Sequence, residues 1–321
     1  IGSNLVFKKN KKFFYIIFLL IFSFFFNQYY GNLGLNPLDS FFSFNSGYDT
    51  LNGFFPFRDY WTITGPFISF FQAFLFKLFG VSWFSYVLQA SIFNIIFSIS
   101  TFFVLYKFGL DINFSFLYAV LLSILAYPSA GTPYVDHQSA YLSIIAIYCF
   151  ILAVKENSKI YWFLLPVILG ISFLTKQAPT SHISIIIIFL SLIYFIINFD
   201  IKKILYGVYG CILIISIFFL ALYLCQIPLL SFYEQYILFP LSLGENRLDF
   251  IFPLELKRLF LRYKLIHLSM LIIYIVLIKN LFWNFKNITS DESLINISLI
   301  TSTYALIIHQ LMTLNGIFIF F

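Results

Sequence analysis

Nine long apolar runs divide the chain, and short polar or charged stretches separate them. A helix that crosses the hydrocarbon core of a bilayer needs about 20 predominantly apolar residues, and fewer when it lies among other helices. The pattern therefore predicts nine membrane-spanning helices. They cover residues 13–30, 82–106, 113–127, 139–154, 160–175, 183–198, 203–226, 265–282 and 293–314.

A tenth apolar run, "PFISFFQAFLFKLF" at 66–79, is too short to span and carries Lys77. It predicts a helix that lies on the outer membrane surface. Pro66 suits the first helical turn, and Gly80 suits the position after the last one. If this run crossed the bilayer instead, the orientation of every later helix would invert.

The basic residues indicate an orientation. With "KKNKK" at 8–12 in the cytoplasm and the spans alternating, eleven of the 19 Lys and Arg residues lie inside and eight outside. Lys and Arg favour the cytoplasmic side. The outer face then collects most of the polar segments, namely 39–59, "YPSAGTPYVDHQ", "LTKQAPTSH" and a long loop at 227–264. Any chemistry is therefore expected on the outer side.

Composition supports this assignment and excludes a water-soluble domain. The chain is 61% hydrophobic and 10% charged, with a mean hydropathy of +0.94, whereas soluble domains carry about 25% charged residues. We therefore expect an all-α, polytopic transmembrane bundle with interfacial helices in the first outer loop. The net charge of +6 does not indicate nucleic-acid binding, because the basic residues form short clusters between apolar runs.

The chain is treated as a single transmembrane domain over 1–321. It begins at Ile1 and ends at Phe321 within "GIFIFF", so we expect both ends to be internal to a longer protein and further helices to follow. The basic start and apolar run of the first span resemble a signal peptide. No small-residue cleavage site follows, which predicts an uncleaved helix.

The first outer loop, "NPLDSFFSFNSGYDTLNGFFPFRDYWTITGP", carries several charges between apolar neighbours. Asp39 follows the first span directly. A carboxylate at that depth costs free energy unless it stays hydrated, pairs or binds a ligand. The alternative is a helix cap, because "NPLDS" resembles a turn into a helix and Asp is a favoured N-cap.

Four features in order resemble the glycosyltransferase-C superfamily. The first is a loop with Asp39, Gly53, "PFRD" at 56–59 and "GP" at 65–66. The second is the aromatic helix ending "FKLFG". The third and fourth are the stretches "PYVDHQSAYLS" and "GISFLTKQAP". The likeness covers about residues 13–200. It is to bacterial members related to protein O-mannosyltransferases and the lipid A aminoarabinose transferase. Many members carry an Asp–Glu pair at the first position. Here Ser40 follows Asp39, which leaves Asp49 and Asp59 as candidate second acids.

The resemblance implies an inverting membrane glycosyltransferase. It would move a hexose or pentose from a polyprenyl-phosphate donor to a lipid, glycan or protein acceptor, on the periplasmic face of a bacterial inner membrane. Such a reaction needs a base, positive charge near the phosphate, and an apolar groove for the prenyl chain. Asp39 is the candidate catalytic base.

The remaining candidates are assigned to substrate binding, and each has a structural alternative. Asp59 also has Arg58 beside it as an ion-pair partner. Asp136 with His137 also suits a cap at the start of a helix. Lys176, with Gln177, also suits a lysine that reaches the membrane surface. Arg258 and Arg262, four residues apart, also suit an interfacial helix on anionic headgroups.

Two questions stay open at this level. A divalent metal is a candidate cofactor, but an Asp–His pair supplies too few ligands to define a site. The rival function is a transporter or flippase of lipid-linked glycans, which predicts charged residues at mid-depth along a path. A purely structural membrane protein would not need the polar break "LTKQ" or three separated outer acids. His309 is read as a packed, hydrogen-bonded residue near the end of a span, and His182 and His267 as lone residues at helix ends.

Overall fold

Long helices stand side by side in the computed structural model of the chain, which describes residues 2–34, 41–125, 131–248, 257–283 and 290–313. No β-strand occurs in these ranges. Six helices are long and apolar enough to cross a membrane. They are α1 (Gly2–Gly31), α4 (Trp83–Lys107), α6 (Val135–Lys155), α8 (Gln177–Ile197), α9 (Ile201–Leu224) and α13 (Asp291–Thr313). The all-α, polytopic membrane prediction is confirmed.

The other three predicted spans are helices too. The helices α5 (Ile112–Leu125) and α7 (Lys159–Phe173) are shorter and run alongside the long ones, and α12 (Lys264–Trp283) packs against α13. Each predicted span therefore has its helix. The largest differences are at three starts: α1 begins eleven residues earlier than predicted, α6 four and α8 six.

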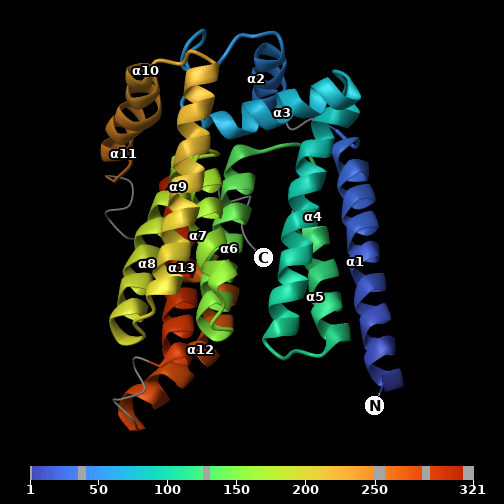
Figure 1. Ribbon diagram of the computed structural model, residues 1–321, viewed down its shortest axis with the longest axis vertical. Coiled ribbons are helices and arrows are strands. Elements are labelled where there is room, and N and C mark those ends of the chain that lie inside the picture. Colours follow the sequence, from blue (N-terminus) through green and yellow to red (C-terminus); the bar gives the residue numbers. More distant parts are fainter. Residues whose placement is uncertain (1, 35–40, 126–130, 249–256, 284–289, 314–321) are drawn as a thin grey trace.

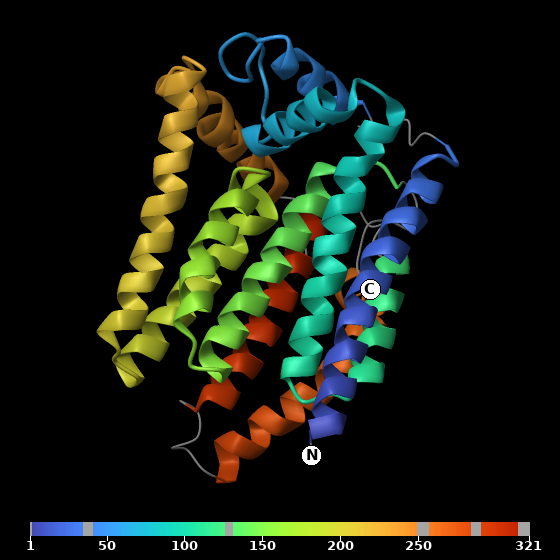
Figure 2. The same cartoon turned by 45° about the vertical axis from the view of Figure 1, so that its right-hand side comes forward.

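The helix predicted on the membrane surface does not run with the bundle. Helix α3 (Pro66–Phe79) lies across one end of it together with α2 (Phe42–Leu51) (Figures 1 and 2). Pro66 occupies the first turn of α3, and Gly80 ends it with a φ of 80°. We call this end of the bundle the α3 end, and the opposite end, where α1 begins, the N-terminal end.

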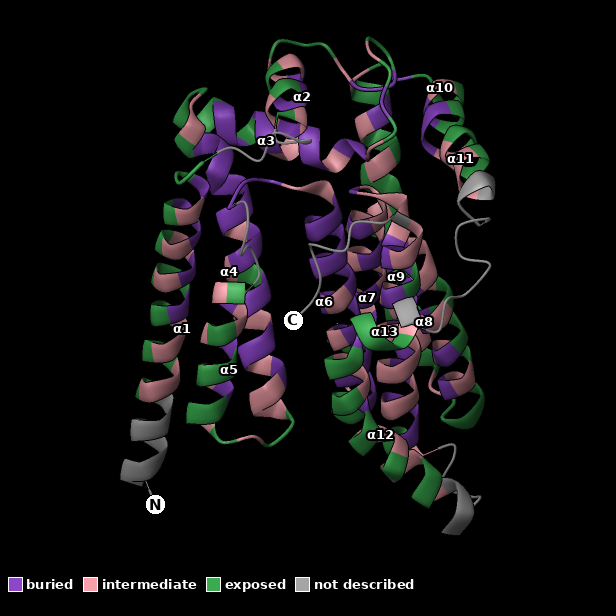
Figure 3. Cartoon of the chain, turned by 180° about the vertical axis from the view of Figure 1, so that it is seen from behind, coloured by how far each residue is buried: buried purple, intermediate pink, exposed green. Residues whose placement is uncertain are grey.

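The bundle consists of two helix groups. Helices α1, α4 and α5 form the first group. In the second group α6 packs with α7, α8 and α13, and α9 packs on α7. Contacts between α4 and α6 join the two groups. Figure 3 shows α6 as the most completely buried helix, and the largest apolar cluster lies between α6, α7, α8 and α13. Hydrogen bonds assist the packing: Asn94 Nδ2 donates to the carbonyl of Ser123 at 2.9 Å. Such polar contacts hold membrane helices together.

Helix α9 is the outermost member of the second group and packs mainly on α7. Most of its side chains are exposed, as expected of a helix that faces lipid. Its close approach to α7 depends on glycine, because a Cβ at Gly210 would lie 2.2 Å from the carbonyl oxygen of Phe163.

The segment 227–264, predicted as a long loop, is mostly helical where it is described. Helix α10 (Leu229–Tyr233), the π-helix η1 (Glu234–Leu238) and α11 (Phe239–Leu248) follow one another at the α3 end, and a second π-helix, η2 (Lys257–Leu261), precedes α12. Prolines start two of these helices: Pro228 is the N-cap residue of α10, and Pro240 lies in the first turn of α11.

Candidate functional site

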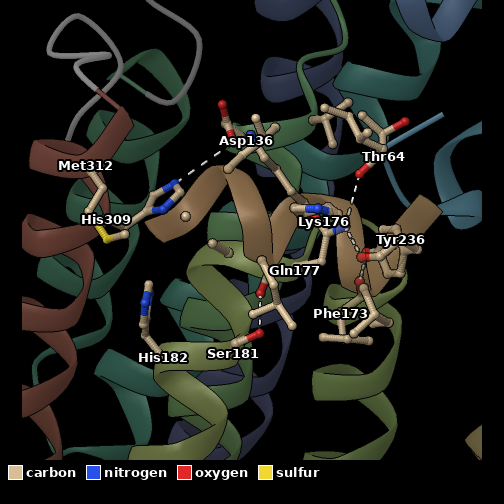
Figure 4. Close-up of a pocket in the computed structure, with 18 of the residues that line it drawn as sticks. Thr64, Asp136, Phe173, Lys176, Gln177, Ser181, His182, Tyr236, His309 and Met312 are labelled. Carbon is tan, nitrogen blue, oxygen red and sulfur yellow. Dashed lines mark hydrogen bonds and ion pairs between the residues drawn. The ribbon is translucent and has the colours of Figure 1, made fainter. Parts of the chain in front are cut away.

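A cavity of about 590 Å³ lies at the α3 end of the bundle, among α8, α11 and α13. This volume is within the range of small-molecule sites. Most of its wall is apolar, and its polar side chains come from separate elements (Figure 4). The carboxylate, ammonium and imidazole groups among them belong to Asp136, Lys176, His182 and His309. An apolar cavity with a few convergent polar groups is the usual form of a ligand site.

Asp136 and Lys176 form an ion pair in this wall. Asp136 lies in the first turn of α6, and Lys176 is the N-cap residue of α8, where α7 ends. The Lys176 ammonium donates to Oδ1 of Asp136. The side chain of Asp136 is 10% exposed and that of Lys176 27% exposed. The pair is therefore partly withdrawn from water, where its attraction is stronger than at an open surface.

The predicted alternatives for these two residues were wrong. Asp136 does not cap α6, because the N-cap residue is Tyr134 and no side-chain cap bond forms there. Lys176 does not extend to the membrane surface but turns inward to Asp136. Sequence spacing could not show this, since 40 residues separate the partners.

A cluster of buried hydroxyl groups holds the chain break that carries Lys176. Ser172 and Thr180 lie 2.7 Å apart across the break between α7 and α8, and Ser139 of α6 lies 2.9 Å from Thr180. The Ser139 hydroxyl also donates to the backbone carbonyl of Lys176 at 3.4 Å. These bonds tie three helices together where the backbone is not helical, which fixes the origin of the Lys176 side chain.

Two histidines complete the polar part of the cavity. His309 Nε2 lies 3.9 Å from Oδ1 of Asp136, a distance at which a protonated imidazole forms an ion pair. His182 of α8 faces His309 of α13, with ring centroids 6.5 Å apart. Figure 4 shows both rings on the same side of the Asp136–Lys176 pair. A carboxylate, an ammonium and two imidazoles thus converge on one space.

Gln177 joins three segments beside the cavity. Its Nε2 donates to the carbonyl of Ile63 at 3.0 Å and to the carbonyl of Tyr236 at 2.6 Å. The second bond has a local cause. In an α-helix the Tyr236 carbonyl would accept from the N–H of residue 240, and Pro240 has none. Gln177 therefore supplies a donor to a carbonyl that lacks its α-helical partner.

Backbone contacts attach the first outer loop to the same break. The N–H of Gly65 donates to the carbonyl of Thr175 at 3.0 Å, and that of Phe67 donates to the carbonyl of Leu174 at 3.1 Å. A Cβ at Gly65 would lie 1.8 Å from the Leu174 oxygen, so only glycine permits this approach. The "GP" step of the sequence is thus a docking point between α3 and the α7–α8 break.

The π-helix η1 supplies the third attachment. Gln235 accepts from the N–H of Thr62 at 3.1 Å and donates to the carbonyl of Phe57 at 3.2 Å. Tyr236 is fully buried, and its hydroxyl donates to the carbonyl of Phe173. Burial raises the pKa of Tyr236 well above its ordinary value, so the phenol stays a donor. The first outer loop, the α7–α8 break and η1 form one connected wall.

Asp59 lies apart from the cavity. Arg58 Nη2 is 2.7 Å from Oδ2 of Asp59, and the same carboxylate accepts from the N–H of Phe55. Arg58 also donates to the carbonyls of Gly53 and Cys225. The hydrogen bonds from Arg58 and Phe55 lower the pKa of Asp59 against the opposing effect of burial. The ion-pair alternative predicted for Arg58 is confirmed, and this pair ties the loop to the end of α9.

Among the residues that the structure describes, the other predicted site residues do not line the cavity. His137 is 3% exposed and packs against Tyr134 and Tyr141, outside the cavity wall. Arg262 is exposed after η2. Asp39 and the side chain of Arg258 lie outside the described residues. Asp136, Lys176 and Gln177 are thus the predicted residues that the structure brings together.

From the sequence, His309 was read as a packed residue and His182 as a lone residue at a helix end, and both line the cavity. A lone histidine in an apolar run carries no local signal of its partners, so sequence reasoning could not find them. His267 is hydrogen-bonded outside the cavity: its ring nitrogens lie 3.2 Å from the Tyr304 hydroxyl and 3.1 Å from the Leu259 carbonyl.

Among the described residues no three His, Cys, Asp or Glu side chains lie close enough to hold a metal ion.

Comparisons with protein-family models, with curated proteins and with solved structures give no match.

Proposed function

We propose that the protein is a membrane glycosyltransferase of the glycosyltransferase-C type. It transfers a sugar from a polyprenyl-phosphate donor to a hydroxyl group of a lipid, glycan or protein acceptor. The observation that carries the proposal is the cavity at the α3 end, in which the Asp136–Lys176 pair and two imidazoles meet a mostly apolar wall. This combination suits a ligand with an anionic head and a hydrocarbon chain.

The apolar side of the cavity continues onto the surface that faces lipid. Leu241 of α11 lines the cavity and is 62% exposed. Ile185, one turn along α8 from the cavity residues Ser181 and His182, is 68% exposed. A prenyl chain that lies along these side chains stays in an apolar environment while its phosphate reaches the polar wall. This route also buries apolar surface, which favours binding.

Lys176 supplies the fixed positive charge for the phosphate. An ammonium acts on a phosphate as a point charge. The strength of its attraction to the phosphate depends on where the ammonium is held. Asp136 holds it in the wall through their ion pair, so in this proposal Asp136 is a positioning residue for Lys176. His309 and His182 face the same space and are hydrogen-bond donors for the remaining phosphate oxygens.

The reaction breaks one bond and forms one. The acceptor oxygen attacks the anomeric carbon, the bond from that carbon to the phosphate oxygen breaks, and polyprenyl phosphate leaves with the electron pair. The acceptor proton passes to a carboxylate, and the anomeric configuration inverts. Asp39 is the candidate base. It comes three residues before Phe42, which lines the cavity, and three residues of chain span at most about 11 Å.

The placement of charge favours this function over a transporter or flippase. A transit path predicts ionisable side chains at mid-depth in the bundle. In the described ranges the Asp, Glu, Lys and Arg residues lie near helix ends or in connections. Polar side chains deeper in the bundle, such as Asn94 and Ser98, are hydrogen-bonded within and between helices. A one-sided site fits this distribution better.

The α3 end is assigned to the periplasmic face of a bacterial inner membrane. The support is the excess of lysines at the N-terminal end, where α1 begins and where Lys107, Lys155, Lys159 and Lys202 lie.

Glycosyl transfer in isolated membranes tests the proposal. Radiolabelled polyprenyl-phosphate sugars are supplied to membranes that contain the wild type, Asp39→Asn or Asp111→Asn at equal expression. Asp111 is a matched control, because it precedes α5 at the N-terminal end and its carboxylate binds the N–H of Asn113. We expect transfer by the wild type and the control, and loss in Asp39→Asn. Absence of transfer with any donor would reject the proposal, and full activity of Asp39→Asn would remove Asp39 from the mechanism.

A further inference from the structure

The side-chain amide of Gln177 has a fixed orientation. Both acceptors of its Nε2 are backbone carbonyl oxygens, those of Ile63 and Tyr236. A carbonyl oxygen cannot donate, so the nitrogen and the oxygen of this amide are assigned without ambiguity. An amide NH₂ group has two hydrogens, and these two bonds use both.

The orientation leaves one polar atom of this side chain available. Oε1 of Gln177 accepts no hydrogen bond from the described part of the chain, and it is not among the atoms sealed from solvent. Gln177 lines the cavity and follows Lys176 directly. The cavity wall therefore holds a cation and, at the next residue, an amide whose nitrogen is committed to two backbone carbonyls and whose oxygen is left as an acceptor.

A fixed acceptor recognises only a group that carries a hydrogen. In the proposed donor lipid the prenyl chain has no hydrogen-bond donor, and an ionised phosphate diester has none. The hydroxyl groups of the sugar are the donors. An acceptor oxygen beside the phosphate would also repel its oxygens, so this part of the wall suits the sugar and the neighbouring Lys176 suits the phosphate.

We propose that Oε1 of Gln177 accepts a hydrogen bond from a sugar hydroxyl of the donor lipid and thereby selects glycosylated over unglycosylated polyprenyl phosphate. This inference rests on the proposed function and adds a specificity-determining residue to it. One neutral hydrogen bond corresponds to about a tenfold difference in affinity.

Two substitutions separate the roles of the amide. Gln177→Lys keeps a donor for the Ile63 and Tyr236 carbonyls and has no acceptor. Gln177→Glu keeps acceptors and loses both donors, so it places a carboxylate against two carbonyl oxygens. We expect Gln177→Glu to lower the thermal midpoint and Gln177→Lys to retain it.

The measurement is binding to the purified protein in detergent. The probes are polyprenyl-phosphate glucose, mannose and arabinose, each compared with polyprenyl methyl phosphate, a diester that carries the same single negative charge and no hydroxyl group. Because the phosphate charge is the same, the ratio of the two affinities removes most of the effect of the added lysine charge. We expect the wild type to prefer at least one glycosylated probe by tenfold or more, and Gln177→Lys to lose about tenfold of that preference.

Each outcome decides a separate point. Binding and transfer by the wild type with an unchanged preference in Gln177→Lys would overturn the role of Gln177 alone. Failure of the wild type to bind any probe would reject the proposed function together with this inference. If Gln177→Lys does not fold, deoxy analogues of the preferred sugar replace it. Loss of about tenfold affinity at one hydroxyl supports the contact, and no loss at any position contradicts it.

Discussion

The Asp136–Lys176 ion pair gives the sharpest prediction for stability, because its partners come from separate helices and lie mostly out of water. Two unit charges about 4 Å apart attract by about 4 kcal/mol at the effective dielectric constant typical of protein sites. The Lys176 side chain is 27% exposed, and solvent screening reduces the attraction. We therefore expect a coupling energy of about 2 kcal/mol between the two side chains.

A double-mutant cycle measures that coupling. Asp136→Asn leaves the ammonium without its partner, and Lys176→Met leaves the carboxylate without its partner. Breaking a buried pair in this way is more costly than replacing both members. The free energy of unfolding, measured by SDS titration in mixed micelles, should fall by about 2–3 kcal/mol in each single variant. The double variant should lose about 2 kcal/mol less than the sum of the singles.

The Lys107–Glu156 pair at the N-terminal end is a matched control. Its side chains are 28% and 30% exposed, so screening should hold their coupling below about 1 kcal/mol. Equal coupling energies for the two pairs, or additive effects of Asp136→Asn and Lys176→Met, would refute the reasoning that the cavity wall strengthens this interaction.

Three further predictions concern other parts of the molecule. Gly210→Ala should destabilise the contact between α7 and α9 by about 1–3 kcal/mol, because the new Cβ would meet the Phe163 oxygen at 2.2 Å. Gly207→Ala, whose nearest neighbour would be 3.7 Å away, should be tolerated in the same unfolding assay. Arg58→Met should speed hydrogen exchange in residues 53–60, since it removes bonds to Gly53, Asp59 and Cys225; unchanged exchange would argue against its role as a tether. The pKa of Asp59 is lowered in the folded protein, so its carboxylate stabilises the folded loop at neutral pH. This stabilisation is lost as the pH falls below the ordinary carboxyl pKa of 3.8 and through the lower folded pKa. Exchange in this loop of the wild type should therefore accelerate over that acidic range, and Asp59→Asn should remove the acceleration.

Hydrophobic periodicity and helix-end signals were sufficient for the architecture. Each of the nine predicted spans corresponds to a helix, and the short run at 66–79 lies across the bundle because Pro66 and Gly80 mark its ends. The starts of α6 and α8 were missed because polar residues continue those helices into the cavity wall. Binary patterning treats such residues as loop, whereas the buried Asp136 is stabilised by Lys176.

The site was predictable only in part. Asp136, Lys176 and Gln177 stood out as polar residues between apolar runs, and the structure brings them to one wall. The separate histidines were not recognisable, since His182 and His309 are 127 positions apart in the sequence and meet only through the packing of α8 on α13. The satisfied carbonyl of Tyr236 could not be foreseen either. Pro240 predicts that the carbonyl lacks its helical partner, but not that Gln177 would supply one.

Photocrosslinking with a donor lipid tests the central claim most directly. Polyprenyl-phosphate sugar with a diazirine in the first isoprene unit is bound to the protein, irradiated and mapped by mass spectrometry, with and without excess unlabelled donor. If the cavity binds the donor, competed labels lie in 178–182 and 237–244, and Lys176→Met reduces them. Labelling spread over the exposed face of α9, insensitive to competitor and to Lys176→Met, would contradict the account.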